Sequence, residues 1–187
     1  MNDLSIQLSV LIPSYNDAAY VHKCISSLLD TERDDFEVIV SDDCSNKETI
    51  KILDSFNDPR LKVVKSSKRI GASNNWKKCL SLAKGNWVHF LASDDYYVKG
   101  SIEDILNSVH ENNTVYLIKH LCFKDGNDKI FEVQCDSEKI NQIFNQEKHI
   151  DWSRLLKFSN HDELVLCIFP RSKLKILSYL SKYSSYS

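Results

Sequence analysis

Short apolar runs and helical patterns alternate along the first 110 residues of the chain. Runs typical of buried strands predict strands at 8–12, 36–40, 61–64 and 87–91. The segments between them carry apolar residues three or four positions apart, as amphipathic helices do; the clearest stripe is Val21, Cys24, Ile25, Leu28 and Leu29. Strands that alternate with helices predict an α/β fold with a mostly parallel central sheet.

Proline, glycine and capping residues predict where these elements begin and end. Pro13 is expected to end the first strand, and Ser45 with Glu48 forms the pattern of a capping box that opens the second helix. Ser73 is expected to cap a third helix, whose predicted inner face is Trp76, Cys79, Leu80 and Ala83. Gly85 is expected to end that helix in the left-handed conformation.

The pattern changes after about residue 110. We expect strands at 115–118 and 164–169, and a hairpin or excursion at 122–131. The stretch 140–158 is expected to be mainly helical, and a last helix is expected at 174–180.

Composition excludes several classes of protein. The 24 basic and 26 acidic residues nearly balance, so the chain lacks the basic excess that a nucleic-acid partner favours. The six cysteines show no zinc-binding spacing, and they fit small buried residues in a reducing cytoplasm. No signal peptide and no apolar run of membrane-spanning length is visible.

Two adjacent carboxylates, Asp94 and Asp95, follow the fourth predicted strand. Open α/β sheets bind ligands at the carboxyl ends of their strands. Adjacent carboxylates repel each other, and a divalent cation relieves that repulsion. Mg²⁺ commonly takes one or two carboxylates together with water and substrate phosphates, so the pair indicates a metal–diphosphate site. The alternative is a solvated turn or a helix cap.

Polar residues also follow the other predicted strands, and they fall at 14–16, 42–43 and 68–69. The four glycines allow no glycine-rich phosphate loop, so a diphosphate must be held by a metal, by basic side chains or by both. Asp43 is placed either to accept from a donor such as a uracil imide or to cap the second helix. Tyr15 either lies against a nucleobase or is an ordinary half-buried aromatic residue.

Four motifs in order, at 8–16, 36–45, 71–76 and 91–95, resemble the family 2 glycosyltransferases of the GT-A fold. The resemblance covers roughly residues 6–110. It implies an inverting transfer of a sugar from a nucleotide-sugar donor to an acceptor hydroxyl, dependent on Mg²⁺ or Mn²⁺.

The resemblance also implies roles for single residues. By position, Pro13 and Tyr15 border the nucleobase and Asp43 binds it. Asp94 binds the ribose or the donor sugar, and Asp95 binds the metal. Lys68 and Arg69 lie near the donor, although they match the family's pattern more loosely.

Two positions depart from the family's pattern. Cys44 stands where the family usually has glycine, which tightens the turn after Asp43. The family's general base is a carboxylate downstream of the metal motif, but no Asp or Glu follows Glu163 here. Either the segment His161-Asp162-Glu163 supplies the base, with Asp162 as the candidate, or the base lies beyond residue 187; we favour the second.

The resemblance implies one GT-A domain over residues 1–187, with a nucleotide-sugar-binding half at 6–110 and an acceptor-side half at 111–187. The expected partners are a nucleotide-sugar donor, with UDP favoured, and a glycan or lipid-linked acceptor in surface polysaccharide synthesis. A cytoplasmic enzyme able to attach peripherally to a membrane fits these partners. The alternative is a non-catalytic nucleotide-sugar-binding module that lacks the base.

Overall fold

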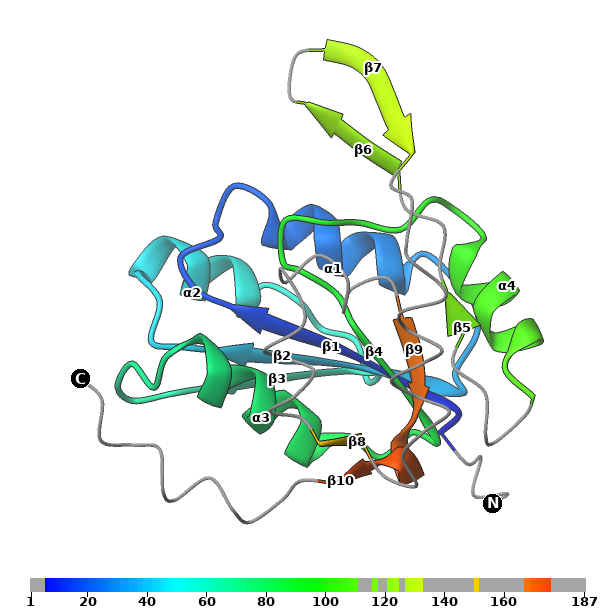
Figure 1. Cartoon of the computed structure of the whole chain (residues 1–187). Helices are drawn as coiled ribbons and strands as arrows, with labels where there is room; N and C mark the ends of the chain where they lie inside the picture. The colour runs from blue at the N-terminus through cyan, green and yellow to red at the C-terminus, as the bar shows by residue number, and fades with distance from the viewer. Residues whose placement is uncertain are drawn as a thin grey trace. The chain divides into compact units, whose positions relative to one another are not determined.

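The structure is a computed structural model, and it describes residues 6–110, 116–117, 121–124, 127–132, 150–151 and 167–175 (Figure 1). The chain divides into two compact units, Met1–Asn112 and Asn113–Ser187. The first unit carries the predicted βαβ pattern.

Four parallel strands form the centre of the first unit, in the order β3-β2-β1-β4. They are β1 (Leu8–Ser14), β2 (Phe36–Asp42), β3 (Leu61–Lys65) and β4 (Trp87–Phe90). The helices are α1 (Val21–Leu29), α2 (Lys47–Leu53), α3 (Ala72–Leu82) and α4 (Ser101–Ser108). The predicted order of strands and helices is confirmed.

The strand order decides which face of the sheet each helix covers. The chain moves outward from β1 to β2 and β3, and then returns past β1 to β4. Because crossovers between parallel strands are right-handed, the reversal puts α3 on the face opposite to α1 and α2. Figure 1 shows α1 and α2 together on one side of the strands and α3 on the other. The carboxyl ends of β1 and β4 therefore flank the switch point where such sheets bind ligands.

The core forms where the apolar faces of these helices meet the central strands. Every residue of β2 is buried, and so are Val21, Cys24, Ile25 and Leu28 of α1. Trp76 of α3 is 8% exposed and stacks on Phe90 of β4, with ring centroids 4.8 Å apart. Trp76 is thus a core residue, as the spacing of the inner face of α3 predicts.

Three predicted helix ends are wrong. The cap of α2 is Asn46, whose Oδ1 accepts a hydrogen bond from Thr49 N at 3.0 Å, rather than Ser45. The residue that precedes α3 is Gly71, with φ of 83°, rather than Ser73. Gly85 is absent from the positive-φ glycines and has a packing role: a Cβ there would lie 2.6 Å from the backbone nitrogen of Ser9.

The second unit contains short strands in its described residues. They are β5 (Tyr116–Leu117), β6 (Leu121–Lys124), β7 (Asn127–Glu132), β8 (Ile150–Asp151), β9 (Cys167–Pro170) and β10 (Leu174–Lys175). β6 and β7 pair antiparallel and confirm the expected hairpin, and β5 pairs antiparallel with β9.

Two segments of this unit that were expected to be helical contain short strands instead. Ile150–Asp151 lies inside the stretch expected to be mainly helical, and Leu174–Lys175 lies at the start of the expected last helix. The two segments pair with each other in parallel, a long-range pairing that local periodicity does not encode. The remainder of both expected helices lies outside the described residues. Among the helices that the structure describes, none is long and apolar enough to span a bilayer.

Candidate functional site

The first strand continues through Pro13 to Ser14, past the end that the proline predicts. Leu11 accepts a hydrogen bond from Leu91 N at 2.9 Å, so Leu11 faces the β4 side. Residues two apart on a strand face the same side, so Pro13 also faces β4. Because β4 has ended at Phe90, the missing N–H of Pro13 costs no ladder bond there.

Asp43 lies at the end of β2 and is 2% exposed. Its Oδ1 accepts from Ile70 N at 2.6 Å, and its Oδ2 accepts from Gly71 N at 2.9 Å. Its own N–H donates to Ser14 O at 3.0 Å. The carboxylate therefore joins the loop after β3 to the ends of β1 and β2. It does not cap α2, so that alternative is wrong.

Cys44 adopts a left-handed backbone conformation in the turn after Asp43. Its φ is 62°, in the left-handed region that favours glycine. A non-glycine residue costs about 1–2 kcal/mol in this conformation. The departure from the family's glycine therefore keeps the turn and carries backbone strain.

The loops after β1 and β3 bring two predicted site residues together. The guanidinium of Arg69 lies 4.0 Å from the ring centroid of Tyr15, in a cation–π contact. Tyr15 is 37% exposed. Lys68 is exposed beside Arg69. Tyr15 and Arg69 therefore present an aromatic surface and a cation at the carboxyl edge of the sheet.

Asn16 joins the loops after β1 and β2. Its N–H donates to Ser45 Oγ at 2.9 Å, and its Oδ1 accepts from Asn46 N at 2.8 Å. The Ser45 hydroxyl is used in this link, which explains why the neighbouring Asn46 caps α2. Asn75 adds a second link, because its Nδ2 donates to Ser41 O at 2.8 Å and also to Ser14 O.

Asp94 and Asp95 follow β4 in a tight turn, in which Asp95 N donates to Ala92 O at 3.1 Å. Asp94 is exposed and Asp95 is half-buried. Burial raises the pKa of the nearby Cys24 thiol, and the charges of Asp95, Asp94 and Asp17 raise that pKa further. Three carboxylates are therefore close enough to act on one buried thiol.

Asp17 is the site residue that the sequence analysis missed. Its Oδ2 accepts from Tyr15 N at 2.9 Å and from the hydroxyls of Ser14 and Ser93. It thereby joins the loop after β1 to the loop after β4 across the switch point. An aspartate three residues beyond a strand end is the only sequence signal for it, and such residues are common in turns.

The segment after Asp95 is anchored in the core. The hydroxyl of Tyr97 is hydrogen-bonded to Nδ1 of His89 in β4, and Tyr97 N donates to Ser27 Oγ at 3.0 Å. Burial raises the pKa of Tyr97 well above its usual value, and the charges of Cys24 and Asp95 add to this effect. These contacts fix the chain on the far side of the carboxylate pair.

The donor chemistry of this edge fits a divalent cation with a diphosphate. No group of three or more His, Cys, Asp or Glu side chains suited to a metal occurs in the part of the chain that the structure describes. A metal bound with a nucleoside diphosphate needs only one or two carboxylates, so a site at this edge does not require a larger cluster. The candidate base Asp162 and its neighbours lie outside the described residues.

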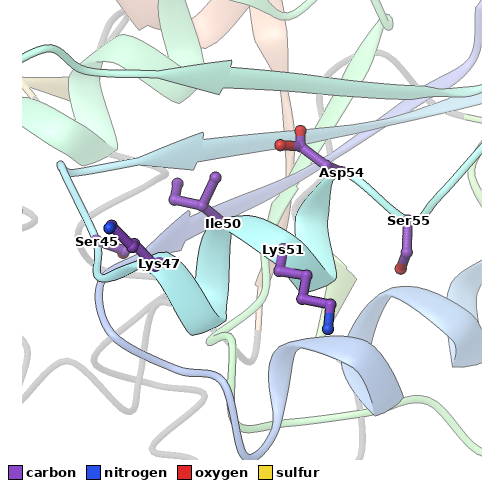
Figure 2. A pocket seen from close by; sticks show the side chains of 6 residues that line it. All are labelled: Ser45, Lys47, Ile50, Lys51, Asp54 and Ser55. Carbon is purple, nitrogen blue, oxygen red and sulfur yellow. The ribbon is translucent and has the colours of Figure 1, made fainter.

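A separate pocket of about 480 Å³ lies on α2, and we call it the α2 pocket. Figure 2 shows its lining side chains, which come from α2 and its two flanks: Ser45, Lys47, Ile50, Lys51, Asp54 and Ser55. It contains none of the predicted site residues. The predicted residues that the structure describes lie instead at the carboxyl end of β1 and on the loops that follow β1, β2, β3 and β4.

Comparison with known proteins identifies the family. The family model described as "Glycosyl transferase family 2" matches residues 9–169. The chain belongs to glycosyl transferase family 2. Its fold is the GT-A fold, with a mostly parallel sheet flanked by helices, as the resemblance of the four motifs implied.

Two curated relatives illustrate the match. The poly(ribitol-phosphate) beta-N-acetylglucosaminyltransferase TarS of Staphylococcus aureus is 34% identical over 119 residues, which are 61% of this chain and 21% of the relative. The Escherichia coli protein WfaP, named UDP-Glc:alpha-D-GlcNAc-diphosphoundecaprenol beta-1,3-glucosyltransferase, is 27% identical over 175 residues, which are 92% of this chain and 64% of the relative. The chain thus spans less than two thirds of either relative.

A solved structure agrees with the fold. The crystal structure of residues 1–349 of S. aureus TarS in complex with UDP-GlcNAc matches with a TM-score of 0.64 and 26% identity. The match covers 89% of this chain and 46% of that one.

Proposed function

We propose that this chain binds a UDP-sugar at the carboxyl edge of its sheet and belongs to an enzyme that transfers the sugar, with inversion, to an acceptor hydroxyl. The observation that carries the proposal is the set of contacts across the switch point, where Asp17 joins the loops of Tyr15 and of Asp94 and Asp95. Nucleotide-binding sheets of this kind hold their ligand at the switch point, outside the carboxyl ends of the strands. The complex of the related TarS with UDP-GlcNAc supports the choice of donor.

The nucleobase side of the proposed site consists of Pro13, Tyr15 and Asp43. Each carboxylate oxygen of Asp43 accepts one backbone N–H and can accept a further hydrogen bond. A uracil imide N–H is one donor that could make this further hydrogen bond. We assign to Arg69 and Lys68 a share in neutralising the phosphates, and the contact of Arg69 with Tyr15 puts its guanidinium at the same edge of the sheet.

The metal side consists of Asp95, with Asp94 on the ribose or the donor sugar. Mn²⁺ or Mg²⁺ bound there would neutralise charge on the departing nucleoside diphosphate. The half-buried position of Asp95 and the turn bond of its N–H hold its carboxylate at the strand end. Asp94 is more exposed, so its carboxylate is available to hydroxyls of the donor.

The acceptor side falls to the second unit. We infer that its acceptor is a glycan or a lipid-linked sugar of a surface polysaccharide. The names of the relatives give poly(ribitol-phosphate) for TarS and GlcNAc-diphosphoundecaprenol for WfaP. Such an enzyme works in the cytoplasm or at the inner membrane surface. A carboxylate must take the proton from the acceptor hydroxyl, and Asp162 is the candidate within residues 113–187. A position beyond residue 187 is the other candidate.

The second candidate function is a non-catalytic nucleotide-sugar-binding module. It differs from the first in having no carboxylate that takes the proton from the acceptor hydroxyl. Incubation with UDP-sugars and Mn²⁺ distinguishes the two candidate functions. A binding module binds UDP but does not release UDP from UDP-GlcNAc, whereas a transferase releases it.

Calorimetry of UDP against ADP tests the proposed donor site. We expect UDP to bind more tightly, and Asp43→Ala to weaken UDP binding by about 1–3 kcal/mol through loss of a charged hydrogen bond. Asp54→Ala, on the surface of α2, is the matched control and should leave UDP binding unchanged. Equal affinities for UDP and ADP would contradict the assignment of Asp43.

A further inference from the structure

A second hollow of about 740 Å³ runs along α1, and we call it the α1 groove. Its volume lies within the range of small-molecule sites, about 300–1,000 Å³. Its lining comes from α1, from the segment before β3 and from the segment after Asp95. The lining residues are Lys23, Ser26, Ser27, Leu29, Asp30, Phe56, Asn57, Asp58, Tyr96, Tyr97 and Lys99.

The α1 groove begins at Tyr96, next to Asp95, and extends away from the donor site. Asp30 follows α1 and precedes β2, and Asp58 precedes β3. That end of the groove therefore lies toward the amino ends of the strands, whereas Asp43 and Asp95 lie at the carboxyl ends. A ligand in the groove does not need the nucleotide or the metal to bind.

Two aromatic rings of the groove are held in place by neighbours. The ammonium of Lys23 lies 3.5 Å from the ring centroid of Tyr96. Phe56 contacts His22, with ring centroids 5.2 Å apart. The segment that carries Tyr96 is fixed along α1, because Tyr97 N donates to Ser27 Oγ. The groove thus has an aromatic side chain on each of its two loop segments, Phe56 and Tyr96.

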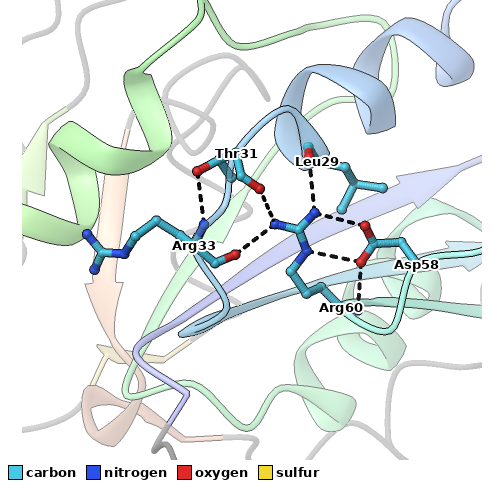
Figure 3. Close-up of polar contacts among 5 residues, drawn as sticks. All are labelled: Leu29, Thr31, Arg33, Asp58 and Arg60. Atoms are coloured by element: carbon cyan, nitrogen blue, oxygen red, sulfur yellow. Dashed lines mark hydrogen bonds and ion pairs between the residues drawn. The ribbon is translucent and has the colours of Figure 1, made fainter.

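The carboxylates of the groove are already paired with cations. Asp30 lies 3.9 Å from Lys99, whereas Lys23 lies over the ring of Tyr96. Asp58 is held by Arg60, whose Nε and terminal nitrogen donate to it at 3.0 and 2.8 Å (Figure 3). A polyanion would meet the two carboxylates, so the lining favours a neutral ligand that both donates and accepts hydrogen bonds.

We propose that the α1 groove binds a neutral oligosaccharide. The C–H face of a sugar ring packs on an aromatic ring, and its hydroxyls match the mixed donors and acceptors of Asn57, Ser26 and Asp30. The inference rests on the proposed function for the source of the sugar, which is a segment of the glycan that the enzyme extends. The groove would hold that glycan away from the reacting edge of the sheet.

The test uses the whole chain in EDTA and without nucleotide. Neutral tetrasaccharides of glucose, galactose, mannose and N-acetylglucosamine are titrated one by one by saturation-transfer NMR and calorimetry. We expect at least one of them to bind, and Asn57→Ala and Lys99→Ala each to weaken it about fivefold or more, the loss of one hydrogen bond. Phe56→Ala should weaken it further, and Lys47→Ala in the α2 pocket should not change it.

Three results would overturn the proposal. They are no binding of any tetrasaccharide up to about 10 mM, binding that all the groove variants leave unchanged, and displacement of the bound sugar by UDP or by inorganic polyphosphate. UDP binding is measured separately on the same protein. A chain that binds a tetrasaccharide in the groove but not UDP contradicts the proposed function alone, and the reverse result contradicts the groove alone.

Discussion

Ser93 donates a hydrogen bond to Oδ2 of Asp17, from the loop after β4 to the loop after β1. The same carboxylate oxygen holds the backbone N–H of Tyr15 at 2.9 Å. One side chain therefore sets the position of the proposed base-contacting residue relative to the carboxylate pair that begins at Asp94. Asp17 acts on the proposed site through its neighbours and is a positioning residue.

Ser93→Ala removes one bond of this link and keeps the rest. We expect UDP affinity to fall by about 1 kcal/mol, because the loop of Tyr15 loses one hydrogen bond of its support. The melting temperature should change little, since Asp17 keeps its bonds to Tyr15 N and Ser14 Oγ. Calorimetry with UDP checks this. The control is Ser108→Ala, which removes an exposed hydroxyl bonded to Asp104 O on α4. Equal UDP affinity of Ser93→Ala and the parent would contradict the positioning role.

Gly85→Ala should destabilise the fold strongly. The added Cβ would lie 2.6 Å from Ser9 N and 2.7 Å from Leu8 C, and backbone atoms of the central strand β1 cannot move away. We expect a loss of about 3 kcal/mol or more in the free energy of unfolding, measured in urea. Gly100→Ala is the matched control: its Cβ meets nothing within 4 Å, and only the positive φ of 87° opposes it. That control should cost about 1–2 kcal/mol. Similar losses for the two variants would exclude the packing role of Gly85.

Arg60 should be important for stability although it lies far from the proposed chemistry. Its guanidinium donates to the carbonyls of Leu29, Thr31 and Arg33 at 2.7–3.0 Å and also to Asp58 (Figure 3). Arg60→Ala removes these hydrogen bonds, although Leu29 O keeps the one from Thr31 N, and should cost about 2–4 kcal/mol in thermal or urea unfolding. Lys65→Ala breaks only the exposed pair with Asp54 and should cost less than about 1 kcal/mol. A near-zero cost for Arg60→Ala would show that the loops hold without it.

The same contact predicts a pH dependence. The hydrogen bond from Arg60 lowers the pKa of Asp58 below its usual value in the folded chain, although burial opposes this shift. A carboxyl with a lowered folded pKa stabilises the fold above the unfolded pKa, near pH 4, and this contribution disappears as the pH falls toward the folded pKa. Asp58→Asn should therefore lose stability at pH 7 and show a weaker acid dependence below about pH 4. Parallel pH profiles for parent and variant would contradict this.

Much of the first unit can be predicted from sequence because its signals are local. Apolar runs and helical stripes place β1 to β4 and α1 to α3, and the core assignment of Trp76 holds. The helix caps fail for a physical reason: Ser45 and Asn46 are both good caps, and only the contact of Ser45 with Asn16, 29 positions away, decides between them.

The links within the site depend on contacts between distant residues, which local patterns do not contain. Ser93 and Asp17 are 76 positions apart, and the carboxylate of Asp43 meets backbone N–H groups 27 and 28 positions away. In the second unit, β8 and β10 also pair although they are distant in the sequence. Local helical patterns do not contain this pairing, so they predicted the wrong structure there. The roles assigned to Tyr15, Asp43, Asp94 and Asp95 stay predictions.

Asp95 is the proposed metal ligand of the donor site. A site made of one or two carboxylates holds Mn²⁺ weakly until phosphates complete its coordination, so metal and nucleotide should bind cooperatively. Asp95→Asn keeps the shape of the side chain and removes its charge, and Asp94→Asn is the neighbouring comparison.

The most direct measurement is the titration of UDP into the parent, Asp95→Asn and Asp94→Asn, each with Mn²⁺ and with EDTA. We predict that Mn²⁺ strengthens UDP binding to the parent, that Asp95→Asn abolishes this effect and nearly keeps the affinity measured in EDTA, and that Asp94→Asn weakens binding even in EDTA. If Mn²⁺ strengthens UDP binding to Asp95→Asn as much as to the parent, the metal is held elsewhere and the central assignment is wrong.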